Sequence, residues 1–243
     1  MEDVFSLFRN EILTADCNAF RGLMRHVAEV NEDRDTVIMV QVENEVGLRG
    51  DSRDRSDIAH TTFKAPVPDC IVDKLEKDWD CLNEDIRKVL SPARYKNGGF
   101  VRGEGWEGAF GSSQQVDELF MAYHYAQYLN AVAAAGKAEY AVPMFSNCWL
   151  PSCEVTAAGG GNSPGIYPSG GPIPSVLDIW QLFCPELDFF SPDGLGGYIP
   201  ILGWGGDVDQ NPCMHTTPYT GSEIQREHNT GIRKCPGGLG KKL

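Results

Sequence analysis

The chain has 243 residues, 42% of them hydrophobic, and its 34 acidic against 21 basic residues give a formal net charge of −13 at pH 7. This composition predicts one globular domain and argues against nucleic acid as a partner, because phosphate binding needs a positive surface. No apolar run approaches the ~20 residues that span a bilayer, and the acidic start is unlike a signal peptide, so a cytoplasmic chain with no membrane partner is expected.

The first predicted elements are a helix and a buried strand. The helix covers residues 15–30, with Asp16 as candidate N-cap, and its apolar residues at helical spacing are Phe20, Leu23, Met24 and Val27. It is expected to pack on a strand over residues 37–45, whose unbroken apolar run predicts burial on both faces, as in parallel sheets. This strand ends in Glu43-Asn44-Glu45, which places charge where barrel enzymes keep their active sites.

Two helices are predicted after a long polar loop, Gly47 to Val67, of a length that is usually functional. Asp69 is expected to cap an amphipathic surface helix with the apolar stripe Ile71, Leu75, Trp79, Leu82, Ile86 and Val89. The capping box Ser112-x-x-Gln115 is expected to open the longest helix, with Gly136 as its stop. The residues of that helix expected to face inward are Leu119, Phe120, Tyr123 and Ala126.

The remaining elements are a strand at 140–150, a short helix at 176–183 and a strand at 187–191, after which eleven glycines and no amphipathic period follow in residues 194–243. Helices alternate with strands up to residue 193. This order predicts an α/β class with a parallel sheet.

The end of the first strand carries the candidate chemistry. Alternate strand residues share a face, so Gln41, Glu43 and Glu45 are expected to point one way and Asn44 the other, unless a bulge or twist brings Asn44 round. A partly desolvated carboxyl group at this rim can have its pKa raised enough to act as a general acid. The alternative, given equal weight, is that both glutamates only pair with arginines of the next loop, namely Arg49, Arg53 or Arg55.

The segment VIMVQVENEVG, residues 37–47, resembles the strand-four motif of the family 35 glycoside hydrolases, β-galactosidases whose (β/α)₈ barrels end this strand in Asn-Glu. Similarity to the bacterial and fungal branch covers roughly residues 10–193, through GLRGDSRDRS, FMAYHYAQYLNAVAAAGKAEYAVPMFSNCWL and YPSGGPIPSVLDIWQLFCPELDFFSPD. The resemblance implies Glu45 as catalytic acid/base and Asn44 as the residue that hydrogen-bonds the sugar hydroxyl beside the anomeric carbon. Glu43 is then a supporting carboxylate, or one satisfied in the barrel interior.

Other candidate sugar-binding residues are Asn147 and Trp149, because strand ends face the substrate and aromatic rings pack on sugars; ordinary core packing is an equally weighted alternative for both. Asp193 matches the end of the Ser-Pro-Asp segment that closes strand six of the family, and there the resemblance stops. The implied partner is a β-galactoside or oligosaccharide, and no cofactor is implied.

The resemblance covers only strands four to six of eight. A retaining glycosidase needs a nucleophilic carboxylate about 5–5.5 Å from the acid/base, and the family's strand-seven glutamate has no counterpart here, because Glu223 and Glu227 follow no predicted strand. We therefore expect residues 1–193 to form an incomplete (β/α)₈ TIM barrel and 194–243 a disordered tail. The chain is then a fragment, inactive alone, of a parent enzyme that removes terminal β-galactosyl residues.

Two alternatives stay open: a truncated product that binds a sugar or partner subunit without catalysis, and a hydrolase of the same clan that acts on another sugar. Metal sites are not predicted. Residues 51–57 lack the glycine and glutamate of a calcium loop, so a salt-bridged active-site loop is expected there. The eight cysteines contain no CxxC pair, which favours free or buried thiols over metal ligands or disulfides.

Overall fold

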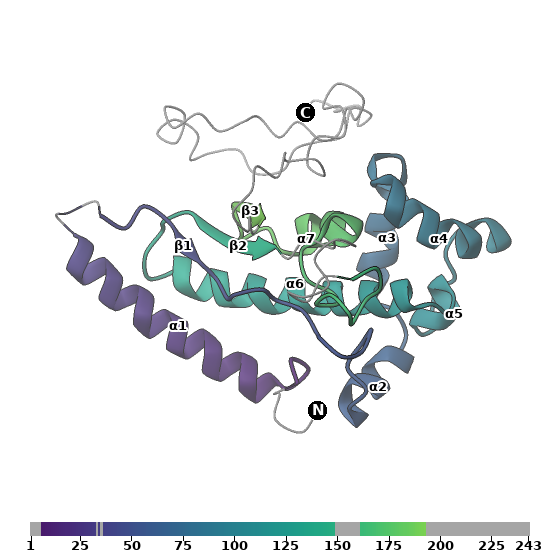
Figure 1. The fold of residues 1–243 in the computed structure, drawn as a ribbon, viewed down its shortest axis with the longest axis horizontal. Helices are drawn as coiled ribbons and strands as arrows, with labels where there is room; N and C mark the ends of the chain where they lie inside the picture. The colour runs from purple at the N-terminus through teal and green to yellow at the C-terminus, as the bar shows by residue number, and fades with distance from the viewer. Residues whose placement is uncertain (1–5, 33, 35, 149–160, 193–243) are drawn as a thin grey trace, which may run out of the picture.

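The computed structural model describes residues 6–32, 34, 36–148 and 161–192. Within these residues, three parallel strands form a small sheet beside a larger group of helices (Figure 1). The strands pair in the order β1 (Val40–Gln41), β2 (Met144–Cys148) and β3 (Phe189–Pro192). Parallel strands linked by helices agree with the predicted α/β class. The three described strands do not close into a barrel.

The helices are arranged around the longest of them, α6, along which α1 and α7 pack (Figure 1). The helices are α1 (Asn10–Asn31), α2 (Asp57–Lys64), α3 (Asp69–Lys77), α4 (Glu84–Asn97), α5 (Trp106–Phe110), α6 (Gln114–Lys137) and α7 (Leu177–Phe183). Short 3₁₀ turns lie at Trp79–Cys81 and Pro174–Val176. No described helix has the length and apolar character of a membrane span.

Helix α6 has the predicted inward face, and its buried residues include Leu119, Phe120, Tyr123 and Ala126. Its boundaries differ from the prediction by one residue at each end. Ser113, not Ser112, is the N-cap, because its Oγ accepts a hydrogen bond from the Val116 N–H at 3.2 Å. Gly136 does not stop the helix; a Cβ there would collide with the ring of Phe20, so glycine lets α1 approach α6 closely.

Helix α1 is present but is longer than predicted and packs chiefly on α6 rather than on β1. Asp16 is not its N-cap, since the helix begins at Asn10; the Asp16 carboxylate instead accepts a hydrogen bond from the Tyr128 hydroxyl group of α6. Met24 is fully buried, whereas Leu23, 54% exposed, lies off the packed face. The packed face of α1 is therefore narrower than the apolar pattern suggested.

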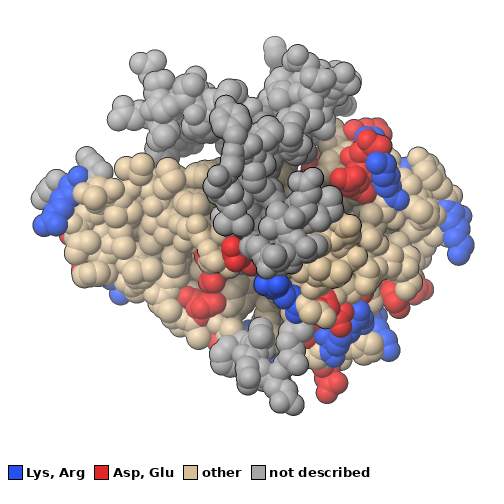
Figure 2. Space-filling model, in the orientation of Figure 1, with Lys and Arg blue, Asp and Glu red and all other residues tan. Residues whose placement is uncertain are grey.

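The single amphipathic helix predicted from Asp69 is wrong: the segment forms α3, a 3₁₀ turn and α4. The break occurs because Asn83 acts as the N-cap of α4, its Oδ1 accepting the N–H groups of Asp85 and Ile86. Most of the predicted apolar stripe is nevertheless buried. Figure 2 shows acidic and basic side chains interspersed over the part of the molecule that carries α3 and α4.

Strand β1 is much shorter than the nine residues predicted. The Val40 N–H donates a backbone hydrogen bond to Pro143 O, just before β2, and the Val42 N–H donates one to Phe145 O within β2. The prediction that this strand is buried on both faces is wrong, because Ile38 is 64% exposed and Met39 38% exposed. The described structure has β2 on only one side of this segment, so its apolar run lacks the second neighbour that a fully buried strand requires.

The preference for free thiols is wrong for Cys81, which is disulfide-bonded. Cys17, Cys70 and Cys184 are free, and burial raises the pKa of Cys184 to about 12. Disulfide formation depends on the distance and direction between two Cβ atoms, which sequence spacing does not report.

An aromatic cluster at the middle of α6 encloses His124. Its ring lies 4.6 Å from the Phe120 ring, 4.7 Å from the Phe8 ring and 4.9 Å from the Tyr123 ring, measured between centroids. Its Nε2 atom has no hydrogen-bond partner in the described residues. Burial lowers the pKa of His124 from 6.5 to about 4, because the apolar surroundings disfavour the charged imidazolium.

Replacing His124 with phenylalanine is expected to remove part of the acid sensitivity of the fold. The unfolded histidine binds a proton near pH 6.5 and the folded one only near pH 4, so the wild-type protein loses stability as the pH falls through this window. The full loss is about 3 kcal/mol. Urea unfolding between pH 4 and pH 8 measures it.

The matched control is His26→Phe, which removes an exposed histidine of α1 and leaves the buried His124 in place, so the acid loss should remain. An unchanged acid loss in His124→Phe would show that other groups cause it.

Candidate active site

The candidate site begins where the chain leaves β1. Glu43 and Glu45 have φ angles of 59° and 47°, in the left-handed region that non-glycine residues rarely adopt. These two residues bend the chain into a turn, so the simple strand alternation does not hold. The distortion brings Asn44 to the side of Gln41, whose Nε2 donates to Asn44 Oδ1 at 3.1 Å and to Glu43 O at 2.9 Å.

Asn147, near the end of β2, joins this turn to the neighbouring strand. The register pairs Gln41 with Phe145, so Asn147, two residues further along β2, lies level with the turn. Its Oδ1 accepts the Glu45 N–H at 2.7 Å, and its Nδ2 donates to Asn44 Oδ1 at 3.2 Å. The structure thus brings together three of the five predicted site residues. Asn147 is only 4% exposed.

The two glutamates of the turn differ in their electrostatic surroundings. Both side chains and that of Asn44 are exposed, above the fully buried Val42. Although it reaches solvent, Glu43 has a raised pKa, caused first by partial desolvation and then by the negative charge of Asp16. Glu43 is therefore a second candidate, beside Glu45, for the general acid that the sequence predicts.

The alternative in which the two glutamates of the turn pair with arginines of the next loop is wrong for Arg53 and Arg55. These two arginines pair with aspartates instead. Arg53 Nε lies 3.1 Å from Asp117 Oδ1, and Arg55 Nη2 lies 2.8 Å from Asp117 Oδ2 and 3.0 Å from Asp51 Oδ1. The Ser52 Oγ donates to Asp117 at 2.6 Å. The salt-bridged loop predicted at residues 51–57 is thus confirmed. Arg53, 4% exposed, also packs its guanidinium over the Phe63 ring.

The loops that follow β1 and β2 are bonded to each other. Leu48 and Ser169 exchange backbone hydrogen bonds at 2.9 and 2.8 Å, and Gly50 N donates to Gly165 O at 2.7 Å. The Ser169 Oγ also donates to Ser52 O at 2.6 Å. These contacts join the two loops into one layer at the carboxyl end of the strands.

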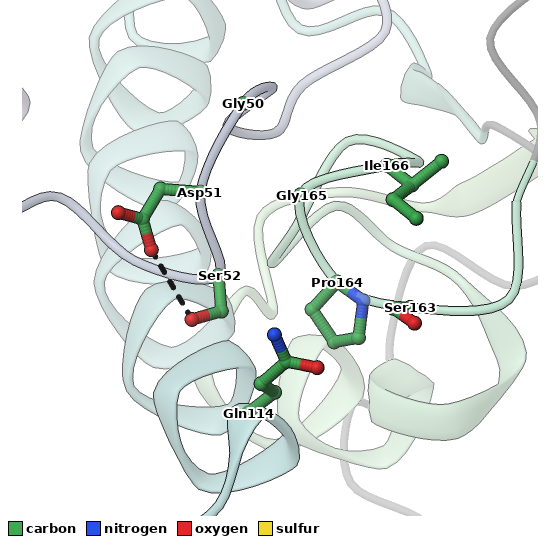
Figure 3. Close-up of a pocket in the computed structure, with 8 residues that line it drawn as sticks. All are labelled: Gly50, Asp51, Ser52, Gln114, Ser163, Pro164, Gly165 and Ile166. Atoms are coloured by element: carbon green, nitrogen blue, oxygen red, sulfur yellow. Dashed lines mark hydrogen bonds between the residues drawn. The ribbon is translucent and has the colours of Figure 1, made fainter.

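A surface pocket of about 380 Å³ lies at the outer edge of this layer, between the two loops and the start of α6 (Figure 3). It is lined by Gly50, Asp51, Ser52, Gln114, Ser163, Pro164, Gly165 and Ile166. Of the predicted site residues that the structure describes, none lines this pocket, so the pocket is separate from the Asn44–Glu45 turn.

Sequence reasoning missed Glu118, a buried carboxyl group beneath the second loop. Glu118 is 1% exposed, and its Oε2 accepts the Tyr167 hydroxyl hydrogen bond at 3.1 Å. Burial raises the pKa of Glu118 to about 7. The available signal was its position beside the predicted inward face of α6, which begins at Leu119.

Trp149 and Asp193, the other two predicted site residues, lie outside the described residues. Among the residues that are described, no group of three or more His, Cys, Asp or Glu side chains is placed to hold a metal ion.

Neither protein-family models nor curated protein sequences match this chain.

Replacing Asp117 with asparagine is expected to destabilise the fold by about 3–5 kcal/mol, because it leaves the buried Arg53 guanidinium without its counter-charge. The free energy of unfolding in urea measures the loss. The control is Asp73→Asn, which breaks an ion pair with Arg102 in which both side chains are at least half exposed. That change should cost far less, because solvent screens an exposed ion pair. Equal losses would contradict an anchoring role for Asp117.

Replacing Glu118 with glutamine is expected to stabilise the protein above pH 7. The folded pKa is raised from 4.5 to about 7, so the contribution of the protonated carboxyl is complete below pH 4.5 and is lost as the pH rises through 7. Glutamine keeps an acceptor for Tyr167 and cannot ionise. The gain in unfolding free energy is about 3 kcal/mol at pH 8 and vanishes near pH 4.5.

The control for this change is Glu84→Gln, at an exposed position at the start of α4. Because this variant keeps Glu118, the loss of stability as the pH rises through 7 should remain. A pH-independent effect of Glu118→Gln would mean that Glu118 does not titrate in this range.

Proposed function

We propose that this chain is the acid/base part of a retaining β-galactosidase with a (β/α)₈ barrel, in which Glu45 is the general acid/base and Asn44 binds the sugar hydroxyl beside the anomeric carbon. The observation that carries the proposal is an exposed Asn-Glu pair at the carboxyl end of a parallel strand, bonded to the end of the next strand. The carboxyl ends of parallel strands are where barrel enzymes keep their catalytic residues. Galactose is proposed as the substrate sugar because the sequence resembles the family 35 β-galactosidases.

The sheet also supports an incomplete barrel. Strands β1 and β3 each have one described neighbour, β2. Two large apolar side chains here are exposed: Ile38, just before β1, at 64%, and Phe189, the first residue of β3, at 39%. Exposed apolar residues at unpaired edges fit a sheet that continues in the parent protein.

In the proposed mechanism, the Glu45 carboxyl group donates its proton to the glycosidic oxygen while a second carboxylate, supplied by the parent, attacks the anomeric carbon. The bond to the leaving alcohol breaks as the bond to that carboxylate forms. The Glu45 carboxylate then accepts a proton from water, which attacks the same carbon and releases the sugar and the second carboxylate. Solvent exposure of Glu45 is compatible with the entry of that water.

The decisive experiment is Glu45→Gln in the parent enzyme, assayed on β-galactosides with poor and good leaving groups. General acid catalysis is worth ~10²–10⁴-fold, so kcat/KM for an alkyl galactoside should fall by that factor. The loss should be much smaller with dinitrophenolate, a leaving group that needs no proton. Equal losses with both substrates would contradict the role of acid.

Glu43→Gln is the matched control, since Glu43 is the turn residue with the raised pKa. If Glu43 were the acid, its variant and not that of Glu45 would show the dependence on leaving group. Parallel assays with nitrophenyl β-glucoside separate galactose from another sugar of the clan. Galactoside binding without turnover by the folded 243-residue chain would favour the alternative of a truncated, non-catalytic binding protein.

A further inference from the structure

We propose that Asn147 and Gln41 are positioning residues that fix the amide orientation of Asn44, so that the Nδ2 of Asn44 is presented to the substrate hydroxyl. This inference rests on the proposed function. It assigns Asn147 a role that acts through Asn44 and Glu45, in place of the direct sugar contact expected from the sequence.

Two donors meet at the side-chain oxygen of Asn44. Asn44 Oδ1 accepts from Gln41 Nε2 at 3.1 Å and from Asn147 Nδ2 at 3.2 Å. Rotating the Asn44 amide by 180° would place its own NH₂ group against both donors. Because two N–H groups cannot hydrogen-bond an NH₂ group, the oxygen stays on the protein side. The Nδ2 of Asn44 is therefore turned away from both of them.

The backbone of the turn has an uncommon conformation at two residues. Glu43 and Glu45 are both in the left-handed region, a conformation that costs of order 1 kcal/mol or more for each and persists only where the surroundings hold it. Gln41 holds one end through Glu43 O, and Asn147 holds the other through the Glu45 N–H. The same two side chains therefore fix both the turn and the amide that it carries.

Asn147 is itself held in place by the sheet. It is 4% exposed and lies on β2, whose parallel pairing with β1 sets its height relative to the turn. A buried amide on a strand is a more rigid anchor than a side chain on a loop. The consequence for specificity is that the site presents a fixed N–H donor, which favours sugars with a hydroxyl group beside the anomeric carbon.

The structural half of the proposal is tested on the 243-residue chain by amide hydrogen exchange at Glu45. Asn147→Leu removes the acceptor of the Glu45 N–H, so exchange at that amide should accelerate at least about tenfold. Asn147→Asp keeps an acceptor and should keep the protection. Ser146→Ala, at the adjacent residue of β2, should leave the rate at Glu45 unchanged. Equal exchange in Asn147→Leu and the wild type would overturn the positioning of Glu45.

The functional half is tested on the parent enzyme with Asn147→Asp. The new carboxylate would face Asn44 Oδ1, and repulsion between the two oxygens should rotate or displace the Asn44 amide. We expect kcat/KM for a nitrophenyl β-galactoside to fall about 10- to 100-fold, because the hydrogen bond to this hydroxyl strengthens in the transition state. For the 2-deoxy galactoside, which lacks this hydroxyl group, kcat/KM should differ little between the wild-type parent and its Asn147→Asp variant.

The outcomes separate the two proposals. A wild-type parent without β-galactosidase activity overturns the proposed function, while the exchange result still decides whether Asn147 positions the turn. An active parent in which Asn147→Asp lowers kcat/KM equally for both substrates overturns the orientation of Asn44. An active parent unaffected by Asn147→Asp overturns it as well.

Discussion

The first turns of α6 hold the site region together through two neighbouring carboxyl groups. The Asp117 carboxylate accepts a hydrogen bond from Ser52 and forms ion pairs with Arg53 and Arg55, all three in the loop after β1. The Glu118 carboxyl group accepts a hydrogen bond from the hydroxyl group of Tyr167, in the loop after β2. Since α6 is also the helix against which α1 and α7 pack, one buried helix fixes both the core and the layer of loops above the strand ends. Asp117 lies in the first turn of the helix, where negative charge is favoured by the helix dipole.

Much of this fold could be predicted because long periodic segments determine their own structure. The inward face of α6 and the parallel order of helices and strands follow from apolar periodicity alone. The boundaries could not be predicted, because a cap competes locally with helix continuation. Asn83 starts a new helix in the middle of the predicted apolar stripe, and Ser113 caps α6 although Ser112 had the better sequence pattern. The length of β1 depends on which neighbours the strand has, and that is a property of the tertiary structure.

The candidate site was predictable in part for a different reason. Asn44 and Glu45 stand out in the sequence because polar residues end an apolar run. Asn147 stands out less, and its contacts with the turn arise from the register between β1 and β2 together with two left-handed residues. Glutamate gives no sequence signal for a positive φ, as glycine would. Glu118 and the Cys81 disulfide were missed because burial and Cβ geometry depend on distant parts of the chain.

The hydrogen-bonded bridge between Leu48 and Ser169 has a consequence for how such a protein can change. Because the two strand-end loops share backbone hydrogen bonds, an insertion or deletion in one of them displaces the acceptors of the other. The side chains of each loop can therefore change independently of the other loop. The lengths of the two loops can change only together. Reshaping the rim of this site, by evolution or by engineering, requires treating both loops as a single unit.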